Sequence, residues 1–336
     1  MPEHRAAKYE PAARNALEMF GIAPRSLRPL PVSENVTFHV TDANDGREYV
    51  LRLHRPGYRT LAQLESERVW TEALRASGIT VPRARSTIGG DAFGLVDIDD
   101  TGERRYAGIL EWIPGEALSA QISRNTDSRS LAQAMATLGE LAARMHEHSS
   151  RWTAPAGFQR PHLNAETLLG NAPHWGRFWD HPTWTASERA AVLATRDHLR
   201  KRLDSLDHDA SRYGMVHADL HAENIVIDRN TLTVIDFDDS SYGWYCYDIA
   251  TTLQPLTTRP EYPGLRAALL SAYRRIRPFG WHDEELLDSL QVVRGLSSIG
   301  WYLQRPEVEA SEPERFEAAK ARALRGCASV LGAAAI

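Results

Sequence analysis

Short strand-like apolar runs mark the first part of this chain, and longer helical periodicities mark the rest. Runs that are β-branched or alternating and bounded by turn residues occupy residues 36–40, 49–53, 93–98 and 106–113. One amphipathic helix is predicted among them, at residues 61–77. Beyond residue 114 a 3.6-residue apolar period predicts helices at 131–145, 188–203, 249–253, 262–275 and 284–303. The pattern predicts a strand-rich first part and a mainly helical second part.

A second hairpin is predicted later in the chain, between two polar motifs. The runs at residues 225–227 and 233–235 are β-branched, and a polar turn at 228–230 separates them. The sequence H-A-D-L-H-A-E-N at residues 217–224 precedes the hairpin, and Asp236 follows it. The hairpin is therefore expected to connect two groups of chemically reactive side chains.

These side chains suit phosphoryl transfer from ATP to a hydroxyl group. That reaction needs a carboxylate near the acceptor proton and oxygen ligands that fix Mg²⁺ against the nucleotide phosphates. In the pattern H-x-D-x-x-x-x-N, Asp219 is expected to face the acceptor hydroxyl, and Asn224 to reach a metal ion. Asp236 would supply the carboxylate that binds the same metal. ATP and Mg²⁺ are accordingly the predicted cofactors.

A zinc site is the alternative for the same loop. His217 and His221 are four residues apart with Asp219 between them, which could form part of a hydrolase ligand set. Such a set needs further His or carboxylate ligands, whereas the other parts of a phosphoryl-transfer site follow here in order. In the phosphoryl-transfer interpretation His217 is structural.

The order of catalytic loop, short hairpin and metal-binding Asp resembles the eukaryotic-like kinase superfamily. The motif I-D-F-D-D at residues 235–239 is followed almost at once by G-W-Y-C-Y-D-I-A at 243–250, which leaves no room for an activation loop. This ending is similar to the aminoglycoside phosphotransferase and choline kinase group, the phosphotransferase enzyme family, and most similar to its bacterial stress-response kinase A and homoserine-kinase-like branch. The resemblance covers roughly residues 30–305. It implies an α+β, bilobal protein-kinase-like fold with a small antiparallel-sheet N-lobe and a mainly helical C-lobe.

The resemblance also implies a set of phosphate-binding residues. Ser33 and Asn35 occupy the place of the Gly-rich loop of protein kinases and would cap the phosphates. Arg52 stands where most kinases carry a strand lysine, and a guanidinium can grip two phosphate oxygens. Glu67 on the following helix would orient Arg52, with Glu65 as the competing choice. The alternative is that Arg52 is an ordinary exposed strand residue with a structural role.

Further roles follow from the same resemblance. Backbone atoms near Glu111 and Ile113, at the hinge between lobes, would bind adenine. His221 takes the place of the catalytic-loop lysine and would touch the transferring phosphate. Asp238 would be an additional metal ligand or an acceptor-site carboxylate.

Length and composition are those of a globular protein with two lobes. The chain has 336 residues, of which 43% are hydrophobic and 25% charged. We predict an N-terminal nucleotide-binding lobe at residues 1–113 and a helical catalytic and substrate lobe at 114–336. Residues 151–185 are predicted to be an inserted element on the substrate side.

Charge and cysteine content favour a cytoplasmic protein without nucleic-acid or membrane partners. The formal net charge is −5, only Cys246 and Cys327 occur, and no apolar signal segment or long apolar run is present. The sequence does not indicate an oligomeric state.

Four other features could have either a functional or a structural role. Histidines flank Glu147 at residues 146–148, but the second histidine of a zinc motif is missing, so a helix end is predicted. The tryptophans of residues 152–184 could enclose a sugar or a cationic ligand or could simply pack. Arg294, on the predicted helix 284–303, could meet a substrate anion or pack. The glutamates of residues 307–314 are interpreted as a solvated turn.

Together these observations predict an ATP- and Mg-dependent phosphotransferase acting on a hydroxyl of a small molecule, such as an amino alcohol, homoserine, a choline-like compound or an aminoglycoside. A Ser/Thr protein kinase of the stress-response type is the first alternative. A nucleotide-binding pseudokinase is the second, based on Arg52 and the missing glycines.

Overall fold

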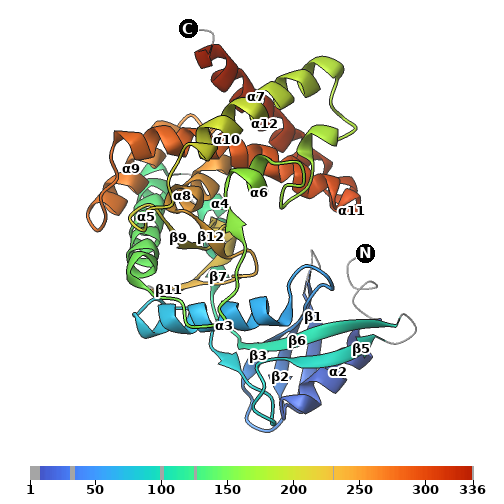
Figure 1. The fold of residues 1–336 in the computed structure, drawn as a ribbon. Coiled ribbons are helices and arrows are strands. Elements are labelled where there is room, and N and C mark those ends of the chain that lie inside the picture. The colour runs from blue at the N-terminus through green and yellow to red at the C-terminus, as the bar shows by residue number, and fades with distance from the viewer. Residues whose placement is uncertain (1–7, 31–34, 99–101, 125–126, 230, 335–336) are drawn as a thin grey trace. The chain divides into compact units, whose positions relative to one another are not determined.

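The structure is a computed structural model, and it describes residues 8–30, 35–98, 102–124, 127–229 and 231–334. The chain forms two compact units (Figure 1). The N-terminal unit consists of residues 1–116, 154–159 and 225–238, and the helical unit of residues 117–153, 160–224 and 239–336. Residues 154–159 of the predicted insertion thus belong to the N-terminal unit. The domain boundary that we predict after residue 113 stays a prediction.

The N-terminal unit is built on an antiparallel sheet. Its strands follow the order β1-β2-β3-β6-β4, with β5 also paired to β6. The elements are α2 (Glu10–Met19), β1 (Pro24–Pro29), β2 (Val36–Asp42), β3 (Glu48–Leu53), α3 (Leu61–Ala76), β4 (Ala84–Arg85), β5 (Gly94–Ile98) and β6 (Glu103–Glu111), and later the hairpin of β10 (Ile225–Asp228) and β11 (Thr231–Val234). The mixed α+β character predicted from the sequence is confirmed.

Helix α2 covers one face of this sheet, and its apolar side chains form the core of the unit. Ala13 and Leu17 of α2 are fully buried with Leu51 and Leu53 of β3. Because side chains alternate along a strand, Arg52 points to the opposite face. Burial on one face therefore aims the predicted phosphate-binding side chain away from the core.

Local capping defines α3, the helix that carries Glu67. The Thr60 side chain accepts from the Gln63 backbone N–H, and the Gln63 side chain accepts from the Thr60 backbone N–H, which is a capping box. Trp70 of α3 is fully buried and meets Phe237 edge-on at 5.6 Å between ring centroids. The segment around Asp236 is thereby packed against α3.

The helical unit contains most of the remaining elements. They are α4 (Leu118–Arg124), α5 (Ser128–Arg151), β8 (His162–Leu163), α6 (Ala165–Leu169), η1 (Phe178–Asp180), α7 (Ala186–Asp204), β9 (Tyr213–Val216), η2 (Ala222–Asn224), β12 (Ser241–Trp244), α8 (Tyr245–Leu253), η3 (Gln254–Leu256), α9 (Tyr262–Arg274), α10 (Trp281–Leu303), α11 (Pro306–Ser311) and α12 (Pro313–Ala334). Strand β7 (Glu116–Ala117) marks the passage of the chain from one unit to the other.

Close helix packing holds this unit together. Helix α5 packs along α9, and α10 packs against both α8 and α12. A Cβ on Gly139 of α5 would lie 2.2 Å from the Leu269 carbonyl oxygen, so only glycine allows this approach of α5 to α9. Strand β12 pairs in parallel with β8 and antiparallel with β9. Strand β9 leads directly into the loop at residues 217–224, so its pairing in this small sheet fixes where the loop begins.

The predicted elements are present, and the structure differs from the prediction in several places. Strand β6 begins at Glu103, within the segment expected to be a turn. The glutamate-rich segment at residues 307–314 was expected to be a solvated turn; this is wrong, because it forms α11 and the start of α12, whose exposed faces accommodate the charges. Further elements were not predicted, namely helices α2, α4, α6 and α12 and strands β1, β4, β7, β8, β9 and β12.

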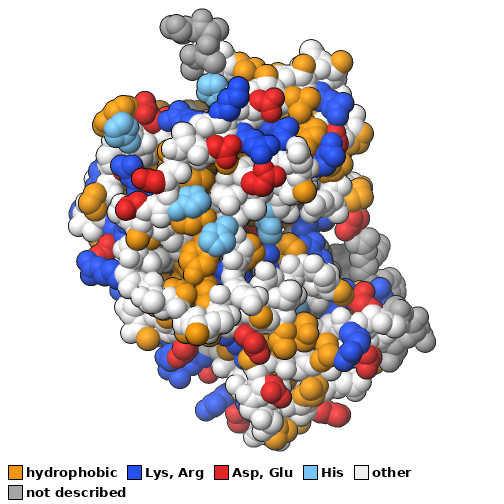
Figure 2. Space-filling view, in the orientation of Figure 1, with side chains coloured by type: hydrophobic (Ala, Val, Ile, Leu, Met, Phe, Trp, Pro, Cys, Tyr) orange, Lys and Arg blue, Asp and Glu red, His pale blue; other side chains and the backbone are white. Residues whose placement is uncertain are grey.

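The surface mixes charges of both signs. Figure 2 shows Lys and Arg side chains interspersed with Asp and Glu over the visible face. Within the described part of the chain, no helix has the length and apolar character to cross a membrane. Three tryptophans of the predicted insertion, Trp175, Trp179 and Trp184, are buried, as is expected of packing residues.

Candidate active site

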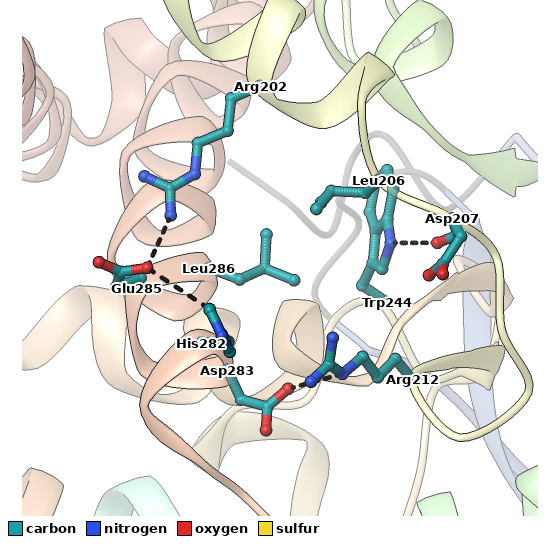
Figure 3. Close-up of a pocket in the computed structure, with 9 residues that line it drawn as sticks. All are labelled: Arg202, Leu206, Asp207, Arg212, Trp244, His282, Asp283, Glu285 and Leu286. Atoms are coloured by element: carbon teal, nitrogen blue, oxygen red, sulfur yellow. Dashed lines mark hydrogen bonds and ion pairs between the residues drawn. The ribbon is translucent and has the colours of Figure 1, made fainter.

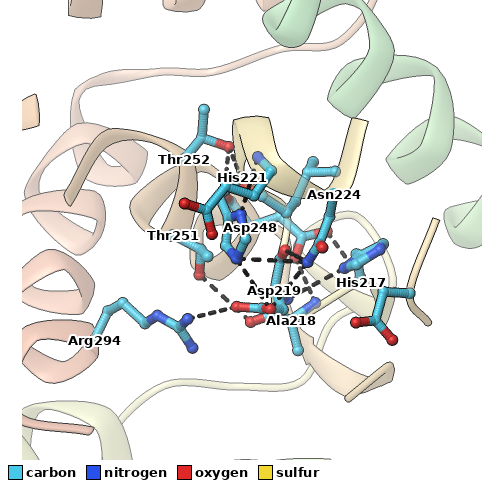
Figure 4. Close-up of polar contacts among 12 residues, drawn as sticks. His217, Ala218, Asp219, His221, Asn224, Asp248, Thr251, Thr252 and Arg294 are labelled. Atoms are coloured by element: carbon cyan, nitrogen blue, oxygen red, sulfur yellow. Dashed lines mark hydrogen bonds and ion pairs between the residues drawn. The ribbon is translucent and has the colours of Figure 1, made fainter. Parts of the chain in front are cut away.

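The loop at residues 217–224 is held by one buried carboxylate, Asp248 of α8 (Figure 4). Asp248 is fully buried and accepts hydrogen bonds from the backbone N–H groups of His217 (2.9 Å) and Ala218 (2.7 Å). Ala218 has a φ of 68°, a left-handed conformation that costs a non-glycine residue free energy. The two hydrogen bonds to Asp248 compensate for this strain. They also fix the backbone just before Asp219 and so the direction in which the Asp219 side chain points.

His146 of α5 completes the support of Asp248. Its Nε2 lies 3.1 Å from Asp248 Oδ2, and its Nδ1 lies 2.9 Å from the Tyr273 hydroxyl. Burial lowers the pKa of His146, and although Asp248 opposes this shift, the ring is best described as neutral, donating to Asp248 and accepting from Tyr273. His146 thus stabilises the loop through Asp248.

Three side chains of the described residues donate to the Asp219 carboxylate (Figure 4). Arg294 of α10 binds Oδ1 at 2.5 Å, while His221 and Asn224 bind Oδ2 at 3.1 and 3.0 Å. Burial alone would raise the pKa of Asp219, but His221 and Arg294 outweigh it and hold this pKa well below its usual range. Asp219 is therefore an ionised carboxylate in a fixed orientation.

His221 and Asn224 have defined orientations in this arrangement. The His221 Nδ1 accepts from the backbone N–H of Glu223, so Nε2 carries the hydrogen that is donated to Asp219. The Asn224 amide nitrogen donates to both the backbone carbonyl and the side chain of Asp219. The amide oxygen of Asn224 is thus turned away from Asp219, and an amide oxygen is a ligand that Mg²⁺ accepts.

In the N-terminal unit, Arg52 and Asp236 form an ion pair of 2.9 Å. The Arg52 side chain is only 14% exposed, so it is not the exposed strand residue of the alternative interpretation. Burial opposes its charge, but Asp236, Asp238 and Glu67 more than offset this and raise the pKa of Arg52. Asp236 has a φ of 63°, the second strained residue of the candidate site. Its side chain is 43% exposed and can reach a ligand.

Asn35 and Asp238 connect the start of β2 to the segment after Asp236. The Asn35 amide donates to Asp238 at 3.1 Å and accepts from the backbone N–H of Arg55 at 2.9 Å. Burial would raise the pKa of Asp238, but Arg52, His54 and Arg59 lower it. Asn35 therefore contacts Asp238 through its amide nitrogen and Arg55 through its amide oxygen, while the predicted roles of Asn35 and Asp238 at the phosphate and metal sites stay predictions.

The other predicted residues are placed as follows. Ser33 lies outside the described residues. Glu67 is half-buried on α3, whereas Glu65 is exposed. At the end of β6 the backbone N–H groups of Glu111 and Trp112 donate to the carbonyls of Arg83 and Glu48, so adenine binding at this segment would use carbonyl groups or Ile113.

The zinc alternative finds no support in the geometry. Among the described residues, no group of three or more His, Cys, Asp or Glu side chains is arranged to hold a metal ion. His217 is fully buried, and its Nδ1 accepts from the backbone N–H of Asp219. The predicted ligands Asn224 and Asp236 would need further oxygen ligands from the nucleotide phosphates and from water, which is the usual situation of Mg²⁺ in kinases.

A pocket of about 200 Å³ lies elsewhere in the helical unit (Figure 3). Its wall contains the ion pairs Arg212 with Asp283 and Arg202 with Glu285, beside Trp244. The residues that line it include none of the predicted site residues that the structure describes. The pocket is therefore separate from the candidate active site.

Three residues of the site were missed by the sequence analysis in their observed roles, and one of them, His146, had been interpreted only as part of a helix end. Asp248 appeared only as a letter of the motif at residues 243–250, and Arg294 was left between substrate binding and packing. A charged residue inside an apolar helix such as α8 is the signal that could have identified Asp248. No sequence signal connects Arg294 to Asp219, 75 residues away.

Several kinases are similar to this chain in sequence or in structure. A family model described as the phosphotransferase enzyme family matches residues 26–287. The amicoumacin kinase of Bacillus subtilis is 24% identical over 282 residues, covering 83% of this chain and 78% of that protein. The hydroxylysine kinase of Mus musculus is 23% identical over 303 residues, covering 84% and 78%. A solved structure of a microcompartment-associated aminopropanol kinase has a TM-score of 0.81 and 32% identity, with 95% of each chain covered.

Proposed function

This chain belongs to the phosphotransferase enzyme family, a family of small-molecule kinases, and from that premise we propose that it transfers the γ-phosphoryl group of ATP, with Mg²⁺, to a hydroxyl of a short amino alcohol. The observation that carries the proposal is the ionised, fixed carboxylate of Asp219 in a loop that also presents the Asn224 amide. The likeness to an aminopropanol kinase supports an amino alcohol as acceptor.

Asp219 is proposed to orient the acceptor hydroxyl and to take its proton as the new oxygen–phosphorus bond forms. The bond between the γ-phosphorus and the bridging oxygen of ADP breaks in the same step, and the proton later leaves to solvent. Phosphoryl transfer has a loose transition state, so a weakly basic carboxylate is sufficient and positioning supplies most of the rate. The lowered pKa of Asp219 is compatible with this role.

Arg52, with Glu67 beside it, is proposed to bind the nucleotide phosphates. A guanidinium buried among carboxylates remains charged and offers paired donors. Asn224 and Asp236 are the proposed ligands of Mg²⁺, which when bound neutralises phosphate charge. Asn35 and Asp238 would hold the start of β2 in place.

The first test uses γ-labelled ATP, Mg²⁺ and a panel of amino alcohols, hydroxy amino acids and a protein lysate. Soluble label is expected with wild type. Asp219→Asn is expected to reduce it by about 10²- to 10⁴-fold, because no carboxylate remains to take the proton of the substrate hydroxyl. Asp204→Asn, an exposed carboxylate of α7, is the matched control and should transfer normally.

Full transfer by Asp219→Asn would refute the assignment of the carboxylate. Label that depends on Asp219 but appears on protein would replace the small-molecule proposal with a Ser/Thr protein kinase. Binding of ATP without any transfer would identify a pseudokinase.

A further inference from the structure

Arg294 of α10 contacts the Asp219 carboxylate. Its guanidinium lies 2.5 Å from Oδ1, and it comes from a helix 75 residues later in the chain. Only 18% of its side chain is exposed. The ion pair is thus largely shielded from solvent, where such a pair is stronger than at the surface.

Aromatic side chains hold the Arg294 guanidinium in place. It lies over the Trp175 ring at 5.6 Å from the centroid, within the range of a cation–π contact. Trp175 in turn stacks on Tyr247 of α8, with the ring planes 4° apart and the centroids at 5.9 Å. Both rings are buried. Arg294 is therefore a fixed donor rather than a mobile surface side chain.

Among the described residues, the donors around Asp219 leave one position on the carboxylate for a further partner. An ionised carboxylate has about four acceptor positions, two on each oxygen. His221 and Asn224 use both positions on Oδ2, whereas Arg294 uses one on Oδ1. The remaining position is on Oδ1, beside Arg294.

We propose that Arg294 is a positioning residue of the phosphoryl transfer, which fixes the Asp219 carboxylate so that its last acceptor position, on Oδ1, receives the substrate hydroxyl. This inference rests on the proposed function. Without Arg294, Oδ1 loses the donor that orients it, and the carboxylate can rotate about its Cβ–Cγ bond. The hydroxyl would then meet Asp219 in many orientations, and misplacement of about 1 Å at a reacting group can cost about 100-fold in rate.

The test compares Arg294→Ala with wild type in the full-length protein, using the acceptor from the panel that wild type phosphorylates. We expect kcat to fall by about 100-fold while the KM for ATP stays unchanged. Added guanidinium ion, far below denaturing concentration, should restore part of the lost turnover of Arg294→Ala, and urea at equal concentration should not. Arg266→Ala, which removes another ion-paired arginine of the helical unit, is the control and should retain turnover.

Unchanged or faster turnover by Arg294→Ala would overturn the proposal and make the ion pair incidental or inhibitory. A loss that guanidinium does not relieve, with a lowered Tm, would assign Arg294 to stability and also overturn it. If Arg294→Ala does not fold, Arg294→Lys decides: reduced kcat with unchanged KM for ATP supports the proposal, and full turnover refutes it. If the proposed function itself is wrong, the result will be different: wild type will transfer no more phosphoryl group to the acceptor than Asp219→Asn does.

Discussion

At the residue scale, the candidate site depends on buried polar groups that are paired with one another. Asp248 accepts from two backbone N–H groups and from His146, and each unpaired donor left by its loss would cost about 1–3 kcal/mol. The contact between Asp219 and Asn224 could be predicted because they lie five residues apart in one loop, whereas their catalytic and metal-binding roles stay predictions. The supports around them are distant in sequence, so no spacing identifies them.

His146 makes the stability of the fold depend on pH. Burial lowers its pKa below the value of about 6.5 for an unfolded chain, so between the two values only the unfolded state binds a proton. Stability is therefore expected to fall as the pH drops below about 6.5, by at most about 1.4 kcal/mol per pH unit from this residue. His146 faces Asp248, Arg277, Tyr273 and Tyr245.

Urea unfolding at pH 7.5 and 5.5 measures this contribution. His146→Gln keeps an N–H donor for Asp248 but cannot protonate, so its stability should change less between the two pH values than that of wild type. His282→Gln, at an exposed histidine, should leave the wild-type difference intact. An identical difference in His146→Gln and wild type would show that His146 is not the titrating group.

At the element scale, helix α10 joins the core of the helical unit to the site. One face is buried against α8 and α12, while Gln291, Arg294, Ser298 and Trp301 form a half-exposed stripe. The sequence predicted this helix, because its apolar periodicity is local information. It did not show which face meets Asp219, because that depends on how α10 packs on the rest of the unit.

A glycine controls how closely α10 approaches the segment that carries Trp175. A Cβ on Gly300 would lie 2.6 Å from the Gly176 carbonyl oxygen and 2.7 Å from that of Trp175. Gly300→Ala is therefore expected to push the segment away and to destabilise the protein by about 1–3 kcal/mol, measured by urea unfolding. Turnover should fall as well, because Trp175 contacts Arg294.

The matched control for this substitution is Gly264→Ala. Gly264 lies in α9, where a Cβ would meet no heavy atom of the described chain within 4 Å beyond its own helix backbone. Alanine there should be neutral or stabilise the helix by up to about 1 kcal/mol. Equal stabilities of the two variants would contradict the close approach at Gly300.

At the scale of the whole molecule, the proposed roles are divided between the two units. Arg52 and Asp236 belong to the N-terminal unit, and Asp219, Asn224 and Arg294 to the helical unit. Substitutions in the two units should consequently separate binding of the nucleotide from transfer. Both measurements are made on the full chain, because each unit contains segments from distant parts of the sequence.

Thermal unfolding with ATP and Mg²⁺ tests this separation. A ligand that binds only the folded state adds about 2.7 kcal/mol when its free concentration is about 100 times Kd, so the Tm of wild type should rise. Asp219→Asn should keep this rise. Asparagine tolerates the left-handed backbone at position 236, so Asp236→Asn should fold. This variant should lose the Mg²⁺-dependent part of the rise in Tm.

ATP without Mg²⁺ provides the baseline, and Asp97→Asn, at an exposed carboxylate of β5, is the control for a lost charge in the N-terminal unit. A full Mg²⁺-dependent rise in Asp236→Asn would remove Asp236 from the proposed metal ligands.

The sequence by itself determined the features that depend on neighbouring residues. It predicted most of the long helices, strands β2, β3, β5 and β6 of the N-terminal sheet, the hairpin of β10 and β11, and the loop that places Asp219 five residues before Asn224, because hydrogen bonding and turn formation there are local. Tertiary structure alone decided the environment of that loop. Arg294 on Oδ1, Asp248 at Ala218 and His146 at Asp248 come from three different helices, and only the packing of α5, α8 and α10 brings their charges together. Such contacts depend on burial and distance in space, which a linear pattern of residues does not encode.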